Sequence, residues 1–138
     1  MAEKELLLGI DLGTSGCKVT LIDTDCNFVG DGYTEYTTYH PNIGWSEQDP
    51  ADWFPAFMHS FGIALEKGVK ASQVVALSLD ASAHNIVLLD KDDRILRKTI
   101  MWTDTRATEE SAFMTEHYGS EIFRIGYQMP SPTWSMLQ

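Results

Sequence analysis

The sequence is poor in basic residues and has no long apolar run. Ten lysines and arginines stand against 20 aspartates and glutamates, which gives a formal net charge of −10. Nucleic acids and anionic membranes attract proteins that present a net basic face, so neither is expected as a partner. No uncharged apolar stretch approaches the roughly 18 residues of a transmembrane helix, and none is predicted.

Cysteine is also scarce, with only Cys17 and Cys26. The two could lie on adjacent strands, but they do not make a disulfide framework, and we expect reduced thiols in a cytoplasmic protein. A zinc site is disfavoured because the sequence lacks a Cys-x-x-Cys pair and clustered histidines. Glu3, Lys4 and Glu5 precede a short apolar run, which is too brief and too acidic a start for a signal peptide.

The 138 residues, 43% of them hydrophobic, are enough for one globular domain with a core. Three strands are predicted at its start. They are the apolar run Leu6–Asp11, the alternating run Cys17–Ile22 and the segment Asn27–Tyr36, which glycines interrupt. Because the turns between them are short, we expect an antiparallel meander.

A helix and a fourth strand are predicted after a polar loop over residues 37–48. Asp49 and Pro50 are typical of a helix start, and Gly68 of a helix end. The apolar residues at helical spacing are Trp53, Phe57, Phe61, Ala64 and Leu65. The strand–helix–strand order predicts that Val74–Leu79 joins the sheet through a parallel crossover.

The rest of the chain is predicted to contain a hairpin and helices. The hairpin spans Ile86–Leu96 around a charged turn. Helices are expected from about Thr105 to His117 and over Ser120–Ile125. Pro132–Gln138 resembles the beginning of another helix without a stop signal, so we expect the chain to be cut from something longer.

The turn between the first two predicted strands is the most informative segment. Residues 9–18 read Gly-Ile-Asp-Leu-Gly-Thr-Ser-Gly-Cys-Lys. Its glycines let backbone N–H groups approach phosphate oxygens, its hydroxyls add donors, and its lysine adds positive charge. The candidate phosphate-binding residues are Gly13, Thr14, Ser15 and Lys18. Asp11 could hold Mg²⁺ directly or through water. The alternative is a hairpin whose glycines merely turn the chain; Walker A and Rossmann spacings are absent.

Four segments resemble the N-terminal domain of the FGGY family of carbohydrate kinases, which has the ribonuclease H-like fold of actin, hexokinase and Hsp70. The segments are residues 9–18, 44–50, 76–85 and 102–106. They occur in family order at family-like separations. Within the family, Trp-Ser-Glu-Gln-Asp-Pro and His84 are most similar to xylulokinases, which usually carry Gln-Met-His-Gly where residues 82–85 read Ser-Ala-His-Asn.

The resemblance implies an α/β fold of the ribonuclease H-like class, with a mixed five-stranded sheet and flanking helices. Residues 1–138 would be the N-terminal domain, and the general base and most of the adenosine pocket would lie in a C-terminal domain outside this chain. The implied activity is transfer of the γ-phosphate of ATP, with Mg²⁺, to a hydroxyl of a ketopentose such as xylulose or a related sugar or polyol. The isolated piece is expected to be inactive, and its exposed apolar surface to promote self-association, for instance as a homodimer.

The resemblance also implies roles for individual residues. Asp11 would be the catalytic residue that orients Mg²⁺ near the transferred phosphoryl group. The residues that contact the nucleotide would be Gly13, Thr14, Ser15 and Lys18. His84 would hydrogen-bond a sugar hydroxyl with Ala83 beside it, and Asp104 would either face the sugar or cap a helix. Asp80 does not match the family's base and is interpreted as structural or supporting.

Two other functions remain open on the sequence. The chain could be a complete, non-catalytic ligand-binding or interaction module of the same fold, because fold does not determine function. It could also be an actin-like or Hsp70-like ATPase, although the segments at residues 44–50 and 102–106 disfavour that interpretation.

Overall fold

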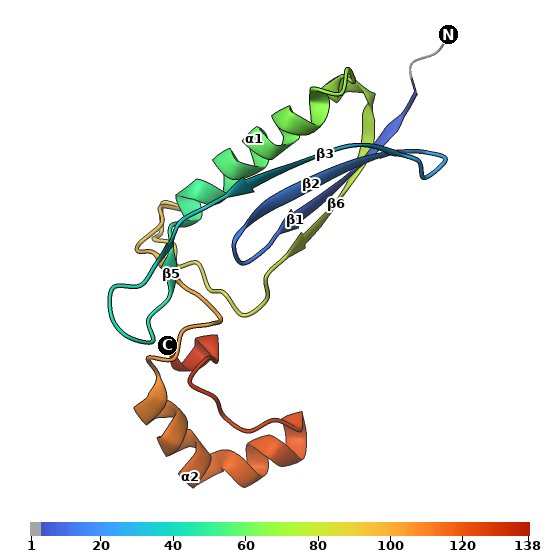
Figure 1. Cartoon of the computed structure of the whole chain (residues 1–138). Coiled ribbons are helices and arrows are strands. Elements are labelled where there is room, and N and C mark those ends of the chain that lie inside the picture. Colours follow the sequence, from blue (N-terminus) through green and yellow to red (C-terminus); the bar gives the residue numbers. More distant parts are fainter. Residues whose placement is uncertain (1–3) are drawn as a thin grey trace. The chain divides into compact units, whose positions relative to one another are not determined.

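The computed structural model describes residues 4–138, and the chain divides into two compact units. Unit 1 contains the residues up to Thr37 together with Pro50–Ser82, and unit 2 contains Thr38–Asp49 and Ala83–Gln138. Each unit is therefore assembled from two separate stretches of sequence. Figure 1 traces the chain from its blue N-terminal strands to its red C-terminal end.

Unit 1 is a mixed four-stranded sheet with one long helix. Its strands are β1 (Leu6–Leu12), β2 (Gly16–Asp23), β3 (Phe28–Glu35) and β6 (Val74–Ala81), in the order β3-β2-β1-β6. The first three form the predicted antiparallel meander, and β6 lies parallel to β1 as the predicted crossover requires. The connecting helix α1 (Trp53–Leu65) covers one face of the sheet (Figure 1).

The core of unit 1 lies between α1 and the central strands. Successive side chains of a strand point to opposite faces, so one face collects the alternate apolar residues of β1 and β2. The buried core residues are Leu6, Leu8, Ile10, Cys17, Val19, Leu21, Ala56 and Ala64. The other face carries the polar residues described below.

Helix α1 packs directly against the backbone of β3. Its fully buried residues are small: Ala56, Ser60 and Ala64. A Cβ on Gly32 would lie 2.0 Å from the Ser60 carbonyl oxygen, and one on Gly30 would lie 2.8 Å from that of Ala64. The glycines that interrupt the strand pattern are therefore what allows the helix to approach. Phe57 and Phe61, which were predicted on the apolar face of this helix, pack at the margin of the core and are only partly buried.

The helix begins slightly later than predicted. Pro50–Asp52 form a short 3₁₀ turn, and α1 starts at Trp53, a common arrangement at helix N-termini. The predicted end is confirmed, because Gly68 adopts a φ of +90° and its N–H donates to the Leu65 carbonyl at 3.1 Å.

Unit 2 contains a small antiparallel sheet and a long helix. The sheet has the order β4-β5-β7, with β4 (Thr38–Tyr39), β5 (Glu47–Gln48) and β7 (Thr99–Ile100). The segment predicted as a polar loop thus supplies two short strands. Their partner β7 comes from much later in the chain, so the local pattern could not reveal the pairing.

Helix α2 (Thr108–Gly126) is continuous, whereas two shorter helices were predicted. Gly119 lies inside it, where a Cβ would come within 2.9 Å of the Met129 side chain. An interior glycine costs a helix only about 1 kcal/mol and need not end it. At the C-terminal end, the predicted helix start is only a 3₁₀ turn, Ser135–Leu137.

The α/β class with a mixed sheet is confirmed, but the predicted number of strands is wrong. The sheet of unit 1 has four strands rather than five within the described residues. The hairpin predicted over Ile86–Leu96 is present in unit 2, where Leu89 and Ile95 form an antiparallel bridge and the N–H groups of Asp90 and Leu96 donate to the carbonyl oxygens of Arg94 and Leu88. The side chains of Leu89 and Ile95 are exposed, and a hairpin without a buried face is only marginally stable.

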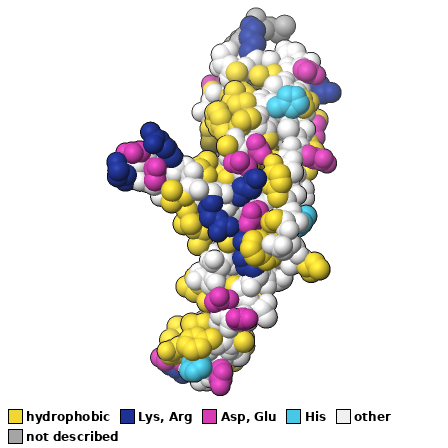
Figure 2. All heavy atoms as spheres, turned by 90° about the vertical axis from the view of Figure 1, so that its left-hand side faces the viewer, with side chains coloured by type: hydrophobic (Ala, Val, Ile, Leu, Met, Phe, Trp, Pro, Cys, Tyr) yellow, Lys and Arg dark blue, Asp and Glu magenta, His cyan; other side chains and the backbone are white. Residues whose placement is uncertain are grey.

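Many large apolar side chains lie at the surface. Figure 2 shows hydrophobic side chains gathered at its lower end, where α2 lies. The large hydrophobic residues that are more than half exposed on α2 or just after it are Phe113, Phe123, Ile125 and Tyr127. Within residues 4–138, no helix has the length and apolar character needed to cross a bilayer.

Candidate functional site

The turn between β1 and β2, residues 13–16, is tightly built. The Gly13 N–H donates to the Gly16 carbonyl oxygen at 3.0 Å. A Cβ on Gly16 would lie 2.6 Å from both the Thr34 carbonyl oxygen and the Tyr33 hydroxyl. No side chain fits at position 16, so this glycine allows the close packing of the turn against β3.

Three charged side chains stand in register across the sheet beside this turn. Asp11 on β1 pairs with Lys18 on β2 and with Asp80 on β6. Residues paired across neighbouring strands project from the same face, so these three form one charged row, and all three are exposed. Together with Gly9, Ile10, Thr20 and Ser78, the charged row lines a shallow depression of about 270 Å³.

The donor set of this depression fits a magnesium–phosphate group. The Asp11 and Asp80 carboxylates and the hydroxyls are oxygen ligands of the kind Mg²⁺ prefers, and Lys18 supplies a point charge for phosphate. Among residues 4–138, no group of three or more His, Cys, Asp or Glu side chains could hold a metal by itself.

Asp80 was interpreted from the sequence as a supporting residue, and the structure places it directly beside Asp11. One of its oxygens accepts a hydrogen bond from the Ala81 N–H at 2.9 Å. The sequence offered a signal for this pairing, because the carboxyl ends of two parallel strands lie at the same edge of a sheet and each strand carries an aspartate one residue before its last.

In unit 2, the segment after β6 is anchored through its backbone and through Asn85. His84 has a φ of +62°, and its carbonyl oxygen accepts a hydrogen bond from the Ser135 hydroxyl. The Asn85 side-chain oxygen accepts from the Trp102 N–H at 2.8 Å. The side chains of Ala83 and His84 remain exposed. The backbone is thus held while the imidazole faces solvent.

Asp104, in contrast, is completely buried, and both of its carboxylate oxygens are engaged. It accepts hydrogen bonds from the Ser46 N–H at 2.6 Å and from the Arg106 N–H at 2.8 Å. The Arg106 guanidinium adds two further bonds, at 3.0 and 2.8 Å. Burial alone would raise the pKa of Asp104, but the hydrogen bonds from Arg106 and Ser46 outweigh it and leave the pKa below its ordinary value.

Arg106 extends this network to the loop before β5. Its guanidinium lies 2.7 Å from a Glu47 carboxylate oxygen and 3.7 Å from the centre of the Trp45 ring. The helix-cap alternative for Asp104 is wrong, because α2 begins at Thr108 with Ala107 at its N-cap. These contacts give Trp45 and Glu47 structural roles within unit 2.

The predicted site residues fall into two groups, one in each unit. Unit 1 holds Asp11, Gly13, Thr14, Ser15 and Lys18, and unit 2 holds Ala83, His84 and Asp104. Sequence reasoning missed Tyr36, whose hydroxyl bonds to the turn of residues 13–16. In an antiparallel meander, the end of the third strand lies beside the turn that joins the first two. The polar side chain of Tyr36 at that end could therefore have been predicted to contact the turn.

The N-terminal domain model of the FGGY family of carbohydrate kinases matches residues 6–135. The chain belongs to this family. Among curated members, xylulose kinase from Bacillus subtilis is 31% identical over 136 residues, covering 93% of this chain. Xylulose kinase from Escherichia coli K12 is 36% identical over 109 residues, covering 79% of it.

Solved structures of FGGY kinases agree in fold. A crystal structure of a xyloylose kinase from Brucella ovis superposes with a TM-score of 0.85 at 36% identity, covering 94% of this chain and 27% of that one. Plasmodium falciparum glycerol kinase with ADP gives 0.81 at 20% identity, which shows the fold alone, over 97% of this chain and 28% of that one. The predicted ribonuclease H-like class is therefore confirmed.

The chain spans about a quarter of the length of these FGGY relatives. It covers 27% of the Bacillus subtilis enzyme and 22% of the Escherichia coli enzyme. The family model that it matches describes the N-terminal domain.

Proposed function

We propose that this chain is the N-terminal part of a sugar kinase that uses ATP and Mg²⁺ to phosphorylate a hydroxyl of a ketopentose such as xylulose, or of a related sugar or polyol. The observation that carries the proposal is the charged row of Lys18, Asp11 and Asp80 beside the turn of residues 13–16, in a chain of the FGGY family. The similarity to xylulose kinases supports the ketopentose.

The residues of unit 1 would bind the triphosphate. Bound ATP would supply the phosphoryl group, with Mg²⁺ neutralising its charge, since phosphoryl transfer depends chiefly on positioning and electrostatics. Lys18 would attract the phosphate oxygens, and the backbone and hydroxyls of residues 13–15 would donate hydrogen bonds to them. Asp11 would hold the ion, and Asp80 beside it would add a second carboxylate.

The residues of unit 2 would bind the sugar. His84 would exchange hydrogen bonds with a sugar hydroxyl through its exposed imidazole, and Ala83 would contact the sugar beside it. Asp104 is assigned a positioning role instead of direct contact, because its oxygens already accept bonds from Ser46 and Arg106.

The remaining machinery would lie outside this chain. We assign the general base and most of the adenosine pocket to a C-terminal domain, consistent with a chain that spans a quarter of its relatives. Buried Cys17 and exposed Cys26 are free thiols, which fits a cytoplasmic enzyme. The isolated chain would not turn over, and sugar-dependent ADP release from it would contradict this assignment.

The decisive test is a substrate panel on the complete enzyme that contains this domain. Pentuloses, hexuloses and polyols would each be supplied with ATP and Mg²⁺, and ADP release would be measured. Preferential phosphorylation of a ketopentose is expected. If no sugar or polyol stimulated ADP release, the kinase proposal would fail and the non-catalytic module would be favoured.

A further inference from the structure

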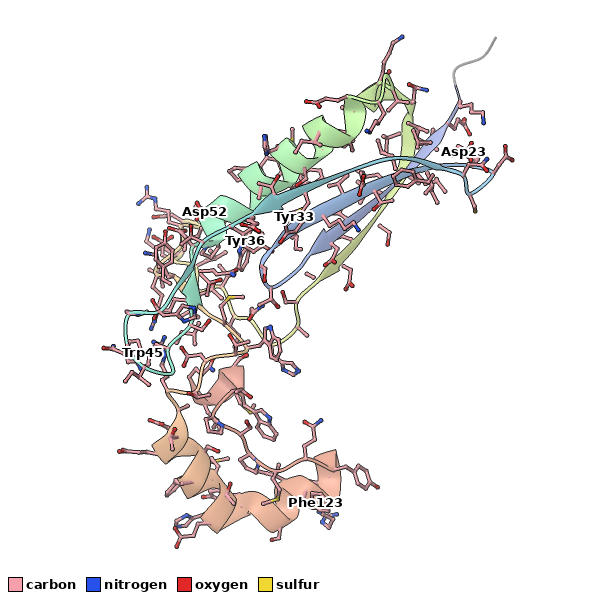
Figure 3. All side chains as sticks on the ribbon, in the orientation of Figure 1. Asp23, Tyr33, Tyr36, Trp45, Asp52 and Phe123 are labelled. Atoms are coloured by element: carbon pink, nitrogen blue, oxygen red, sulfur yellow. The ribbon has the colours of Figure 1, made fainter. Side chains whose placement is uncertain are left out.

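Tyr36 follows strand β3 and reaches across to the turn of residues 13–16 (Figure 3). Its hydroxyl shares its one proton between the Gly13 carbonyl oxygen and the Gly16 carbonyl oxygen, which lies 3.1 Å away. Its own backbone N–H donates to the Ser15 carbonyl oxygen at 3.3 Å. One residue therefore engages three carbonyl groups of the turn.

This arrangement decides which way the peptide N–H groups of the turn point. In a planar trans peptide the N–H lies opposite the C=O. Because the Gly13 carbonyl is directed at the Tyr36 hydroxyl, the N–H of the same peptide, on Thr14, is directed away from that hydroxyl. Gly16 is buried, and the Gly13 N–H already donates to the Gly16 carbonyl oxygen. Tyr36 therefore fixes the backbone on either side of Thr14 and Ser15, which are not buried and whose hydroxyls can donate to phosphate oxygens.

The Tyr36 hydroxyl is a dependable donor in this position. Burial raises the pKa of Tyr36 to about 12, with smaller contributions from the negative charges that Cys17, Asp11 and Tyr33 can carry. The hydroxyl therefore keeps its proton at neutral pH. Tyr33 offers a matched comparison, because its hydroxyl also reaches the turn near Gly16 while its side chain is 48% exposed.

We propose that Tyr36 is a positioning residue of the phosphate site, holding the backbone of residues 13–16 in the conformation that places Thr14 and Ser15 against the nucleotide. The inference rests on the proposed function. It adds a residue from the third strand to a site that the sequence pattern confined to the first two.

The test compares the 138-residue chain with its Tyr36→Phe and Tyr33→Phe variants by amide NMR. Without ligand, hydrogen exchange of the Gly13 amide should quicken about tenfold in Tyr36→Phe, while exchange in α1 and in Tyr33→Phe stays at the wild-type rate. With magnesium tripolyphosphate as the probe, the dissociation constant read from the turn amides should rise about fivefold to tenfold in Tyr36→Phe only, as expected for one lost hydrogen bond.

The outcomes separate the two ideas. Wild-type exchange and wild-type affinity in Tyr36→Phe would overturn the role of Tyr36 and leave the kinase proposal standing. Turn amides of the wild-type chain that do not respond to magnesium tripolyphosphate would overturn the phosphate site itself. If fast amide exchange in α1 shows that Tyr36→Phe is unfolded, Tyr36→Met replaces it, since methionine also lacks the hydroxyl. The Gly13 amide exchange rate and the dissociation constant of magnesium tripolyphosphate are then measured on that variant.

Discussion

Arg106 donates hydrogen bonds to both carboxylate oxygens of Asp104 in unit 2. Its Nε lies 3.0 Å from Oδ1 and its Nη2 lies 2.8 Å from Oδ2. Such two-point contacts between guanidinium and carboxylate fix geometry as well as charge. Because Asp104 also accepts from the Ser46 N–H, the pair ties the loop before β5 to the segment after β7.

Removing this carboxylate should destabilise unit 2. Asp104→Ala leaves Arg106 partly buried with Glu47 as its one remaining anionic partner among residues 4–138, and breaking a buried pair on one side costs about 3–5 kcal/mol. Urea unfolding followed by tryptophan fluorescence would measure the loss. Glu116→Gln, at an exposed position of α2, should change the free energy of unfolding by less than about 0.5 kcal/mol. Equal effects of the two variants would contradict the network.

Acid should weaken the same network. The pKa of Asp104 lies below its ordinary value in the folded chain, so the unfolded chain takes up the proton first as the pH falls. The contribution of Asp104 is therefore complete above about pH 5 and is lost as the pH falls below about 4. Unfolding free energies from pH 6 to pH 2.5 should fall less steeply in Asp104→Asn than in wild type. Parallel curves would rule out this source of acid sensitivity.

Asp11 should be essential for turnover in the complete enzyme. Asp11→Ala removes the central carboxylate of the charged row, and we expect kcat to fall by at least about a hundredfold. Sugar affinity, measured by calorimetry, should remain unchanged, since the sugar is assigned to unit 2. Asp31→Ala, exposed on β3, is the control and should keep wild-type kcat. Normal turnover in Asp11→Ala would remove Asp11 from the mechanism.

Two glycine substitutions should have opposite effects on stability. Gly32→Ala places a Cβ 2.0 Å from the Ser60 carbonyl oxygen, so α1 must move away and the chain should lose about 1–3 kcal/mol. Gly62→Ala meets nothing within 4 Å on an exposed face of α1 and should gain about 0.5–1 kcal/mol. Denaturant midpoints measured side by side decide this, and a neutral Gly32→Ala would refute the close packing of α1 on β3.

Strand β6 should promote self-association of this chain. It lies at the end of the strand order, and its Val75, Leu77 and Leu79 side chains are 54%, 66% and 58% exposed. Sedimentation equilibrium should show a concentration-dependent dimer that Leu77→Lys weakens at least about tenfold. Leu96→Lys, at a 62% exposed position of unit 2, serves as the control. A monomer at all concentrations, or equal effects of both lysines, would contradict a contact through β6.

Local sequence patterns predicted much of the secondary structure but not the contacts between segments that are distant in the sequence. Leu6–Asp11 and Cys17–Ile22 could be predicted as strands because alternation and a Gly-rich turn are properties of neighbouring residues. The strands β4 and β5 could not, because their ladder depends on Thr99–Ile100, far along the chain. The continuity of α2 through Gly119 depends likewise on how Met129 packs back against it.

The antiparallel meander, the crossover helix, the acidic and basic residues near the first turn and the family could all be predicted from the sequence, since each depends on short-range pattern and residue type. Only the tertiary structure decided that Asp80 stands beside Asp11, that Asp104 is enclosed by Arg106 and Ser46, and that Tyr36 holds the turn. The physical reason is that strand register and side-chain burial arise from packing between distant segments, and a hydrogen bond between such segments leaves no periodic trace in the sequence.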